Sequence, residues 1–171
     1  QMRRFYKVAT FMNIVEKIRS SYSDFNITTD IIVGFPGETE EDFNESCRIS
    51  KEEEFSHTHT FKYSVRSVTR AARMTGQVPE KIKNERSRII RNISEENKRK
   101  FRSGFIGKEQ LVLGERVDHK TGLAKGYGTH YVPVTFKASE HSRNRFNRVK
   151  VTGISRGEDP LLEGELLEVQ G

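Results

Sequence analysis

The sequence is poor in the residues that build covalent or metal-based cross-links. Its 171 residues include one cysteine, Cys47, and no tryptophan. A single thiol cannot form an internal disulfide framework, a cysteine-based zinc site or an iron–sulfur site held by three thiolates. No apolar run approaches about 18 residues, so the sequence predicts no membrane-spanning helix. Residues 1–4 lead into no apolar signal-peptide core, and we therefore expect a protein of the cytosol.

Apolar residues are also scarce, and the charge is uneven. Hydrophobic residues and the 13 glycines together reach about 40% of the chain, below the roughly 45–50% of an average soluble domain. The formal net charge is +6, but residues 1–55 carry 7 basic and 11 acidic side chains, residues 56–110 carry 14 and 5, and residues 111–171 carry 9 and 8. The basic middle third indicates either a nucleic-acid-binding surface or a solvated helix face.

The first 75 residues show alternating helix and strand patterns. Apolar spacing predicts a helix over residues 10–20, and residues 27–33 and 57–63 have strand patterns. Thr39 and Asp42 form a capping-box pattern at the start of a second helix. This order predicts a parallel sheet, with strand 27–33 covered on both faces. Two strands do not make a stable sheet of this kind, so we expect a slice of a larger α/β domain, in a piece of a longer protein.

The remaining residues predict a long helix and a small all-β domain. Residues 79–103 read as one helix with Pro79 in its first turn, a narrow isoleucine stripe and an otherwise exposed, strongly basic surface. Strand patterns punctuated by glycines follow at 109–116, 123–127, 131–137, 147–154 and 161–169. Five short strands in about 60 residues indicate a small barrel, which either binds oligonucleotides on one face or only packs against its neighbour.

The most distinctive string is T-D-I-I-V-G-F-P-G-E-T at residues 29–39. An acid within an apolar strand is costly without a partner. Asp30 is expected on the same side as Ile32, near the carboxyl end of the strand, where α/β folds bind ligands. Its carboxylate would accept hydrogen bonds from ribose hydroxyls or would form a structural ion pair or cap. Gly34 and Gly37 allow the backbone to approach a ligand closely, but no phosphate-loop lysine follows them.

A second string, F-K-Y-S-V-R-S-V-T-R-A-A at residues 61–72, follows the next strand. Arg66 would bind a carboxylate through two hydrogen bonds, or it is an ordinary surface arginine. His57 and His59 share one face of the preceding strand. No third ligand stands at a suitable spacing, which favours a structural role over a metal site.

The two strings and their spacing resemble the C-terminal part of a radical S-adenosylmethionine methylthiotransferase. The family pattern is close to T/S-D-x-I-V-G-F-P-G-E-T, then F-x-Y-S-x-R-x-G-T-x-A, then a small barrel called the TRAM domain. Residues 2–6 and 84–86 most resemble the branch that modifies threonylcarbamoyladenosine in tRNA. Branches that act on isopentenyladenosine or on a ribosomal protein are alternatives, and so is a non-catalytic RNA-binding module.

The resemblance implies a fold, cofactors and a partner. Residues 1–78 would be the C-terminal portion of a radical S-adenosylmethionine α/β partial barrel, residues 79–104 a basic connecting helix, and residues 105–171 a TRAM-type, OB-like barrel that binds tRNA. The whole enzyme would use S-adenosylmethionine and two [4Fe–4S] clusters to install sulfur and a methyl group on the adenosine next to the anticodon. The resemblance implies no membrane association and no obligate protein partner.

The resemblance also implies roles for individual residues. By position, the cofactor-binding residues would be Asp30, Gly34, Phe35, Pro36, Gly37, Ser64 and Arg66. Asp30 would hold the ribose of S-adenosylmethionine, and the loop 34–37 would shape the cofactor site. Ser64 and Arg66 would lie near the amino-acid part of the cofactor or near the substrate.

The expected RNA-binding residues combine positive charge with aromatic rings, which suits phosphate contact and base stacking. They are Lys98, Arg99, Arg102, Lys125, Tyr127, His130, Lys137 and Arg145.

The sequence departs from the family pattern at several points. Val68 stands where the family has glycine, and Lys62 stands where proline is frequent. Every cluster cysteine is absent, and Cys47 is expected to be a small buried apolar residue. We therefore expect no catalytic and no metal-binding residue in this segment, which should be inactive alone.

Overall fold

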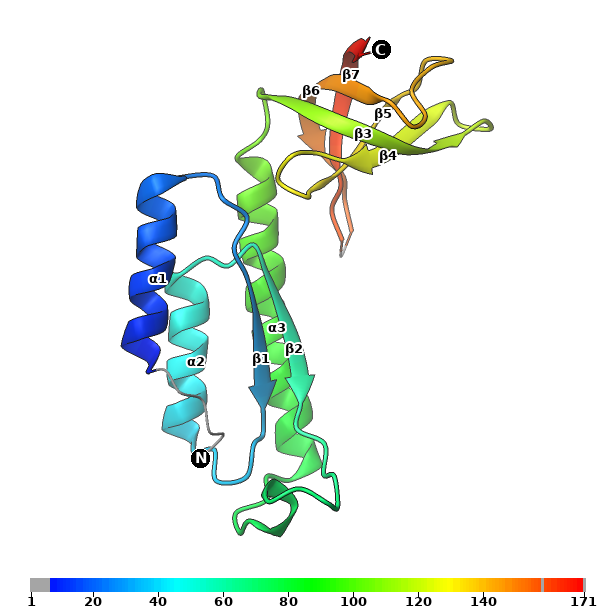
Figure 1. Cartoon of the computed structure of the whole chain (residues 1–171). Coiled ribbons are helices and arrows are strands. Elements are labelled where there is room, and N and C mark those ends of the chain that lie inside the picture. The colour runs from blue at the N-terminus through cyan, green and yellow to red at the C-terminus, as the bar shows by residue number, and fades with distance from the viewer. Residues whose placement is uncertain (1–6, 158, 171) are drawn as a thin grey trace.

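The computed structural model describes residues 7–157 and 159–170, which form an α/β unit followed by a β-barrel (Figure 1). The mixed α/β class is confirmed. Residues 2–6, on which part of the resemblance rests, lie outside the described residues. None of the helices among the described residues has the length and apolar character needed to cross a membrane.

The α/β unit contains two parallel strands and three α-helices. In chain order these are α1 (Val8–Ser21), β1 (Thr28–Val33), α2 (Glu40–Glu52), β2 (His57–Lys62) and α3 (Glu80–Ser103), with a 3-10 turn at Ala71–Arg73. The parallel register pairs Thr28 with His57 and Val33 with Lys62. The predicted capping box starts α2, because Thr39 and Asp42 exchange side-chain and backbone hydrogen bonds.

The helices cover one face of this small sheet, and the prediction that β1 is covered on both faces is wrong for the described chain. Val33 packs with Phe43 of α2 and with Ile90 and Ile93 of α3. On the opposite face, Thr28, Asp30 and Ile32 of β1 are exposed. Among the described residues no element lies on that face of β1, so its apolar side chain stays in contact with water.

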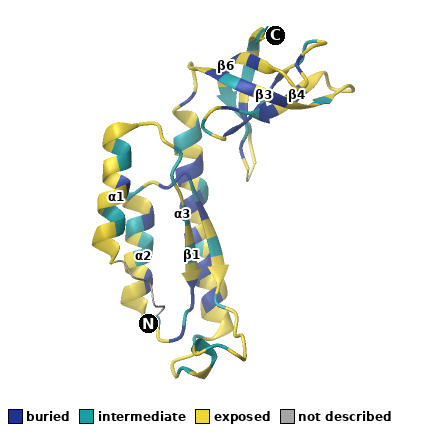
Figure 2. Ribbon diagram, in the orientation of Figure 1, coloured by how far each residue is buried: buried dark blue, intermediate teal, exposed yellow. Residues whose placement is uncertain are grey.

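The prediction of an exposed basic helix is wrong for three cations of α3. Lys83, Arg86 and Lys98 are buried, each 6% exposed. Lys98 lies one turn after the buried Ser94, while Lys83 and Arg86 share a helix face with Ile90 and Ile93, because residues three, four and seven apart lie on one side of a helix. That face packs against the sheet, and Figure 2 shows buried residues along the length of α3. The helix is therefore a covering layer of the α/β unit, and Pro79 is its N-cap residue.

The second part is a closed five-stranded barrel, consistent with a small OB-like barrel. Its strands are β3 (Glu109–Asp118), β4 (Leu123–Tyr127), β5 (Pro133–Lys137), β6 (Phe146–Ile154) and β7 (Leu162–Gln170). They close in the order β3-β4-β5-β7-β6, and only the β5–β7 pair is parallel. All five predicted strands are present, with ends shifted by a few residues. Gly126 is required in β4, because a Cβ there would overlap the carbonyl oxygen of Leu113.

The two parts meet at the end of α3 (Figure 1). Phe105, just beyond the helix, is 2% exposed and belongs to the core of the barrel together with Val134, Phe136 and Leu162. The arrows of β1 and β2 point away from the barrel. The carboxyl ends of these strands, where ligands bind in α/β folds, therefore lie at the opposite end of a helix about 36 Å long (24 residues at 1.5 Å each).

Candidate functional site

A cavity of about 510 Å³ lies at the carboxyl ends of β1 and β2. It is lined by Ile32, Phe35, Phe61, Lys62, Tyr63, Ser64, Arg66, Thr69 and Ala71. Three of the predicted cofactor-binding residues, Phe35, Ser64 and Arg66, are among them. The volume falls in the range of about 300–1,000 Å³ that is usual for small-molecule sites. An apolar floor with a hydroxyl and a guanidinium at its edge suits a ligand that has both a flat ring and a charged end.

The other predicted cofactor residues surround this cavity without lining it. Asp30 is exposed, lies on the same face of β1 as Ile32, and is paired in register with His59 of β2. Gly34, Pro36 and Gly37 form the turn that follows β1, in which both glycines have positive φ angles of 74° and 82°. Six of the seven residues therefore lie at the carboxyl ends of the two strands, and Asp30 lies two register pairs before the Ile32–Phe61 pair that lines the cavity.

A carboxylate within the turn fixes its shape. The backbone N–H of Gly34 donates to the carboxylate of Glu38, which is 11% exposed. Arg86 of α3 donates to the same carboxylate at 2.7 Å, and also to Glu40 at 3.0 Å and to the carbonyl of Thr39 at 3.3 Å. Burial by itself would lower the pKa of Arg86, but the hydrogen bonds to Glu40 and Glu38 outweigh it and raise that pKa. Arg86 therefore holds the turn as a permanent cation.

Lys83 supports the same turn from one helical turn earlier. A Cβ on Gly34 would overlap the methylene chain of Lys83, so this position excludes side chains by packing as well as by φ. The Lys83 ammonium lies 5.5 Å from the ring centre of Tyr63, and that ring meets Phe35 edge-on with centroids 5.4 Å apart. The cavity wall formed by Phe35 and Tyr63 is thus braced by α3.

The described residues offer no metal centre. Across residues 7–157 and 159–170, no three His, Cys, Asp or Glu side chains gather in a way that would hold an ion. The rings of His57 and His59 do meet, edge-on at 4.4 Å, without a third partner of that kind. Cys47 is half-buried against the α2–α3 core, and burial raises the pKa of its thiol, which disfavours the reactive thiolate.

The predicted RNA-binding residues separate into two groups. On the barrel, Lys125 and Lys137 are exposed on β4 and β5, Arg145 is exposed before β6, and the ring of Tyr127 stacks on Tyr131 with centroids 4.7 Å apart. The three cations of this group are therefore open to solvent.

The second group lies at the joint between the barrel and α3. Lys98 pairs with Glu95 at 2.8 Å and with Asp159 at 3.6 Å. Arg102 binds Asp159 at 3.0 Å and the carbonyl of Pro160, while Arg99 donates to the carbonyl of Gly157 at 3.0 Å. Burial raises the pKa of Asp159, but Arg102 and Lys98 outweigh it, so that the net shift lowers this pKa.

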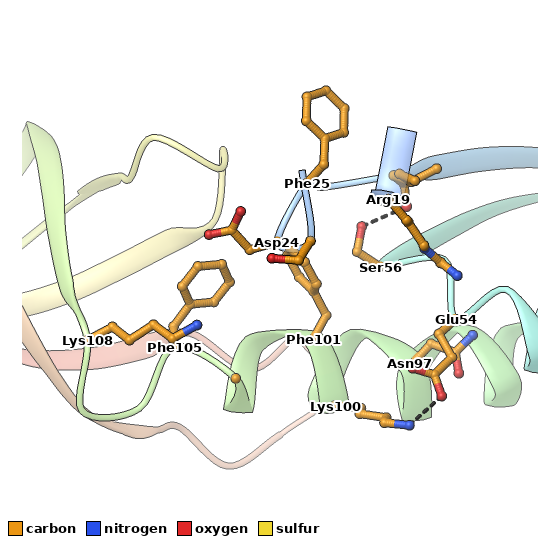
Figure 3. Close-up of a pocket in the computed structure, with 13 residues that line it drawn as sticks. Arg19, Asp24, Phe25, Glu54, Ser56, Asn97, Lys100, Phe101, Phe105 and Lys108 are labelled. Atoms are coloured by element: carbon orange, nitrogen blue, oxygen red, sulfur yellow. Dashed lines mark hydrogen bonds and ion pairs between the residues drawn. The ribbon is translucent and has the colours of Figure 1, made fainter. Parts of the chain in front are cut away.

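His130 completes the joint from the barrel side. Its Nε2 lies 3.2 Å from the Asp24 carboxylate, its ring packs on Phe105, and its carbonyl accepts a hydrogen bond from Asn26 at 2.6 Å. A cavity of about 360 Å³ lies beside these contacts, and Figure 3 shows its lining residues, which come from α1 and the loop after it, from the segment after α2, and from α3 and the segment that follows it. Lys98, Arg102 and His130 therefore have structural partners here.

Comparisons with known proteins bear on both regions. A search of protein-family profiles finds no match. The chain is 41% identical to threonylcarbamoyladenosine tRNA methylthiotransferase MtaB of Thermotoga maritima over 91% of its own length and 35% of that protein. It is 34% identical to the protein of the same name from Bacillus subtilis, over 99% of this chain and 38% of that one.

A relative with a second name matches almost as well. The tRNA-2-methylthio-N(6)-dimethylallyladenosine synthase of Caldicellulosiruptor saccharolyticus is 37% identical over 91% of this chain and 33% of its own length. The chain is a homologue of the tRNA methylthiotransferases. The resemblance drawn from the two strings is confirmed, and the chain spans about a third of the length of these methylthiotransferases.

Sequence reasoning missed Glu38, Lys83 and Arg86 as parts of the site. A signal for the two cations was present, because residues 83, 86, 90, 93 and 97 follow the spacing of one helix face and that face contains Ile90 and Ile93. This signal was overlooked because lysine and arginine are rarely buried unless they are paired, so Lys83 and Arg86 were expected on the exposed face.

Proposed function

We propose that the protein to which this chain belongs is a tRNA methylthiotransferase that uses S-adenosylmethionine and two [4Fe–4S] clusters. The observation that carries the proposal is the similarity to tRNA methylthiotransferases over 91–99% of the chain. The α/β unit would be the last portion of a radical S-adenosylmethionine partial barrel, and the second part would be a TRAM-type barrel that binds tRNA. Such an enzyme acts in the cytoplasm, where tRNA is modified.

The cavity at the carboxyl ends of β1 and β2 fits S-adenosylmethionine in chemical character. Ile32, Phe35 and Phe61 offer apolar contact to a nucleobase, and Arg66 offers a bidentate partner to a carboxylate. The carboxylate of Asp30, on the same face, is placed to accept hydrogen bonds from ribose hydroxyls. When bound, S-adenosylmethionine supplies the hydrogen-abstracting radical and the methyl group. The described residues supply binding and orientation, and the clusters would be held by cysteines elsewhere in the protein.

The substrate nucleoside has two candidates. Threonylcarbamoyladenosine is favoured by the relative with 41% identity over 91% of the chain. Dimethylallyladenosine, which is isopentenyladenosine, is supported by a synthase from Thermobifida fusca that is 46% identical over 66% of the chain. Both candidates are modified adenosines of tRNA, and either would receive the methylthio group.

Mass spectrometry of nucleosides from cells that lack the gene tests the proposal directly. We expect one methylthio-adenosine to be missing and its precursor, either threonylcarbamoyladenosine or dimethylallyladenosine, to accumulate. The mass of the missing nucleoside identifies the branch. An unchanged nucleoside profile contradicts the proposal and favours a ribosomal-protein substrate or a non-catalytic RNA-binding module.

A second experiment tests the cofactor site in the full-length protein. Asp30→Ala should weaken S-adenosylmethionine binding by about 10- to 150-fold, because it removes an acceptor whose hydrogen bonds are charge-assisted and contribute about 1.5–3 kcal/mol. The iron content should be unchanged, since no cluster ligand is altered. Asp24→Ala, at the far end of the unit, is the matched control. Equal affinity in both variants would remove Asp30 from the site.

A further inference from the structure

A pair of stacked tyrosines projects from the β4–β5 turn of the barrel. The rings of Tyr127 and Tyr131 are 4.7 Å apart and nearly parallel, at 16°. Tyr131 is 76% exposed, so the face of its ring that does not touch Tyr127 is open to solvent. A ring that serves only packing is normally withdrawn from water, because burial of its surface is what stabilises the fold.

The backbone at Tyr131 adopts a costly conformation to present this ring. Its φ angle is 55°, in the left-handed region that residues other than glycine seldom occupy. Such a conformation costs about 1–3 kcal/mol, and strain of this kind concentrates at ligand sites. The turn is held by hydrogen bonds between Gly128 and Val132 and between Tyr131 and Gly128. The surrounding turn therefore stabilises a conformation that the tyrosine itself disfavours.

Positive charge lies beside the tyrosine pair on the same outward surface. Lys125 precedes Tyr127 by two residues and therefore shares its side of β4, about 7 Å away along the strand. Arg116 of β3 is paired with Lys125, and Lys137 of β5 is paired with Leu123. All three cations are exposed and make no ion pair among the described residues. They form a row of charges that leads to the stacked rings.

A cavity of about 250 Å³ opens beside the rings, between the barrel and β2. Its lining includes Tyr127, Tyr131 and Pro133 from the barrel, and His57 and His59 from β2. The faces of the tyrosine rings provide a stacking surface, and the imidazole nitrogens provide both hydrogen-bond donors and acceptors. This combination suits a planar, polar heterocycle such as a nucleobase.

We propose that the Tyr127–Tyr131 pair binds an unpaired base of the RNA, stacked on the open face of Tyr131 at the mouth of this cavity, while Arg116, Lys125 and Lys137 bind the flanking phosphates. This inference rests on the proposed function, which supplies RNA as the partner. Duplex RNA keeps its bases stacked on each other, so this site recognises a single-stranded loop or bulge.

The test is a titration of the 171-residue chain with a fluorescently labelled 12-nucleotide single-stranded RNA of mixed sequence. Tyr131→Asn removes the ring and keeps a residue that tolerates a positive φ angle. It should weaken binding about 5- to 100-fold, as expected for the loss of base stacking worth about 1–3 kcal/mol. Tyr131→Phe keeps the ring and should bind within about twofold of the original chain. Tyr22→Asn, at an exposed tyrosine after α1, is the matched control and should also have no effect.

Salt dependence separates stacking from charge. Lys125→Gln should reduce the slope of log affinity against log salt by about 0.7, whereas Tyr131→Asn should leave the slope unchanged. Photo-crosslinking with 5-iodouridine in the same RNA should modify Tyr131 or Tyr127. The inference fails if Tyr131→Asn binds as tightly as the original chain, or if crosslinks map only to other surfaces. Failure of the original chain to bind this RNA and intact tRNA would instead overturn the RNA-binding part of the proposed function.

Discussion

Each end of α3 holds a neighbouring segment through an arginine–carboxylate pair, but the two pairs differ in their exposure to water. At the amino end, Arg86 holds the turn after β1 through Glu38, and the two side chains are 7% and 11% exposed. At the carboxyl end, Arg102 holds the barrel through Asp159, whose side chain is 70% exposed. The first ion pair is shielded from water, and the second is half open to it. The helix therefore carries a buried clamp, the Arg86–Glu38 pair, at the candidate cofactor site and a hydrated joint, the Arg102–Asp159 pair, at the barrel.

The difference follows from what else each end contributes. At the amino end, the hydrogen bonds of Arg86 and the packing of Lys83 on Gly34 hold the turn. At the carboxyl end Phe105 enters the barrel core, and apolar burial supplies most of the attachment. The Arg102–Asp159 pair then orients the barrel more than it stabilises it. Four substitutions test whether the two ends of α3 differ in this way.

Arg86→Met should have the largest effect. It leaves the Glu38 carboxylate buried without its cation, and removal of one partner of a buried pair costs about 3–5 kcal/mol. Denaturant unfolding monitored by circular dichroism measures the loss. Arg88→Met removes an exposed arginine of the same helix and should cost less than about 0.5 kcal/mol. Equal effects of the two substitutions would show that the clamp does not exist.

Gly34→Ala should have the second-largest effect. It should lower the free energy of unfolding by about 1–3 kcal/mol, because alanine disfavours the left-handed φ angle at this position. The new Cβ must also displace the methylene chain of Lys83. Gly122→Ala is the matched control, because Gly122 has a similar φ angle of 70° with open space around it. Thermal unfolding measures both losses of stability, and the amount by which Gly34→Ala exceeds Gly122→Ala gives the contribution of packing against Lys83. No excess would mean that the lysine side chain moves aside freely.

Asp159→Asn should cost less than about 1 kcal/mol, because the Asp159 side chain is 70% exposed and water screens its charge. Its effect should shrink further at about 0.5 M salt, whereas the loss in Arg86→Met should persist, since buried charges are screened less. Unfolding at low and high salt measures both. A salt-independent loss at Asp159 would contradict the contrast between a hydrated joint and a buried clamp.

His57 should make the smallest of the four contributions to the free energy of unfolding, and this contribution should depend on pH. Burial, together with the charges of Lys98 and His59, lowers the pKa of His57 below its ordinary 6.5. The folded state then binds the proton less readily than the unfolded state does, so the stabilisation is complete above pH 6.5 and declines as the pH falls toward the lowered value.

His57→Gln should therefore flatten the fall in melting temperature between about pH 7.5 and pH 5.5. His119→Gln, at an exposed histidine of the β3–β4 turn, should not change it. Identical pH profiles for the original chain and His57→Gln would rule out this contribution.

Much of the fold was predictable from local patterns. An apolar run located β1, alternation located β2, short strand patterns between glycines located the five barrel strands, and Thr39 with Asp42 marked the start of α2, because these signals depend only on neighbours along the chain. The glycine turn after β1 was also predictable, since Gly34 and Gly37 lie in one short stretch of sequence with Asp30. The strand 131–137 was predicted two residues too long at its start, because Tyr131 leaves the extended conformation for a positive φ angle.

Other features could not be read from the sequence. The partners of Arg86 are 46 and 48 residues away, and Asp159 is 57 residues from Arg102. Helix spacing places Lys83 and Arg86 on the face of Ile90 and Ile93, but it does not show which distant carboxylate pairs with a buried cation such as Arg86. The same reason explains why Lys98 and His130 were expected at an RNA surface and are found in the joint.

The sequence by itself thus determined the order of helices and strands, the glycine turn after β1 and the resemblance to methylthiotransferases. Each of these depends on backbone propensity or on contiguous residues. Packing in three dimensions decided which carboxylates pair with the buried cations of α3, that the glycine turn after β1 and the barrel lie at opposite ends of that helix, and that Tyr127 and Tyr131 stack beside β2. These depend on contacts between segments far apart in the chain, whose strength comes from burial and charge pairing that form only once the segments are packed together.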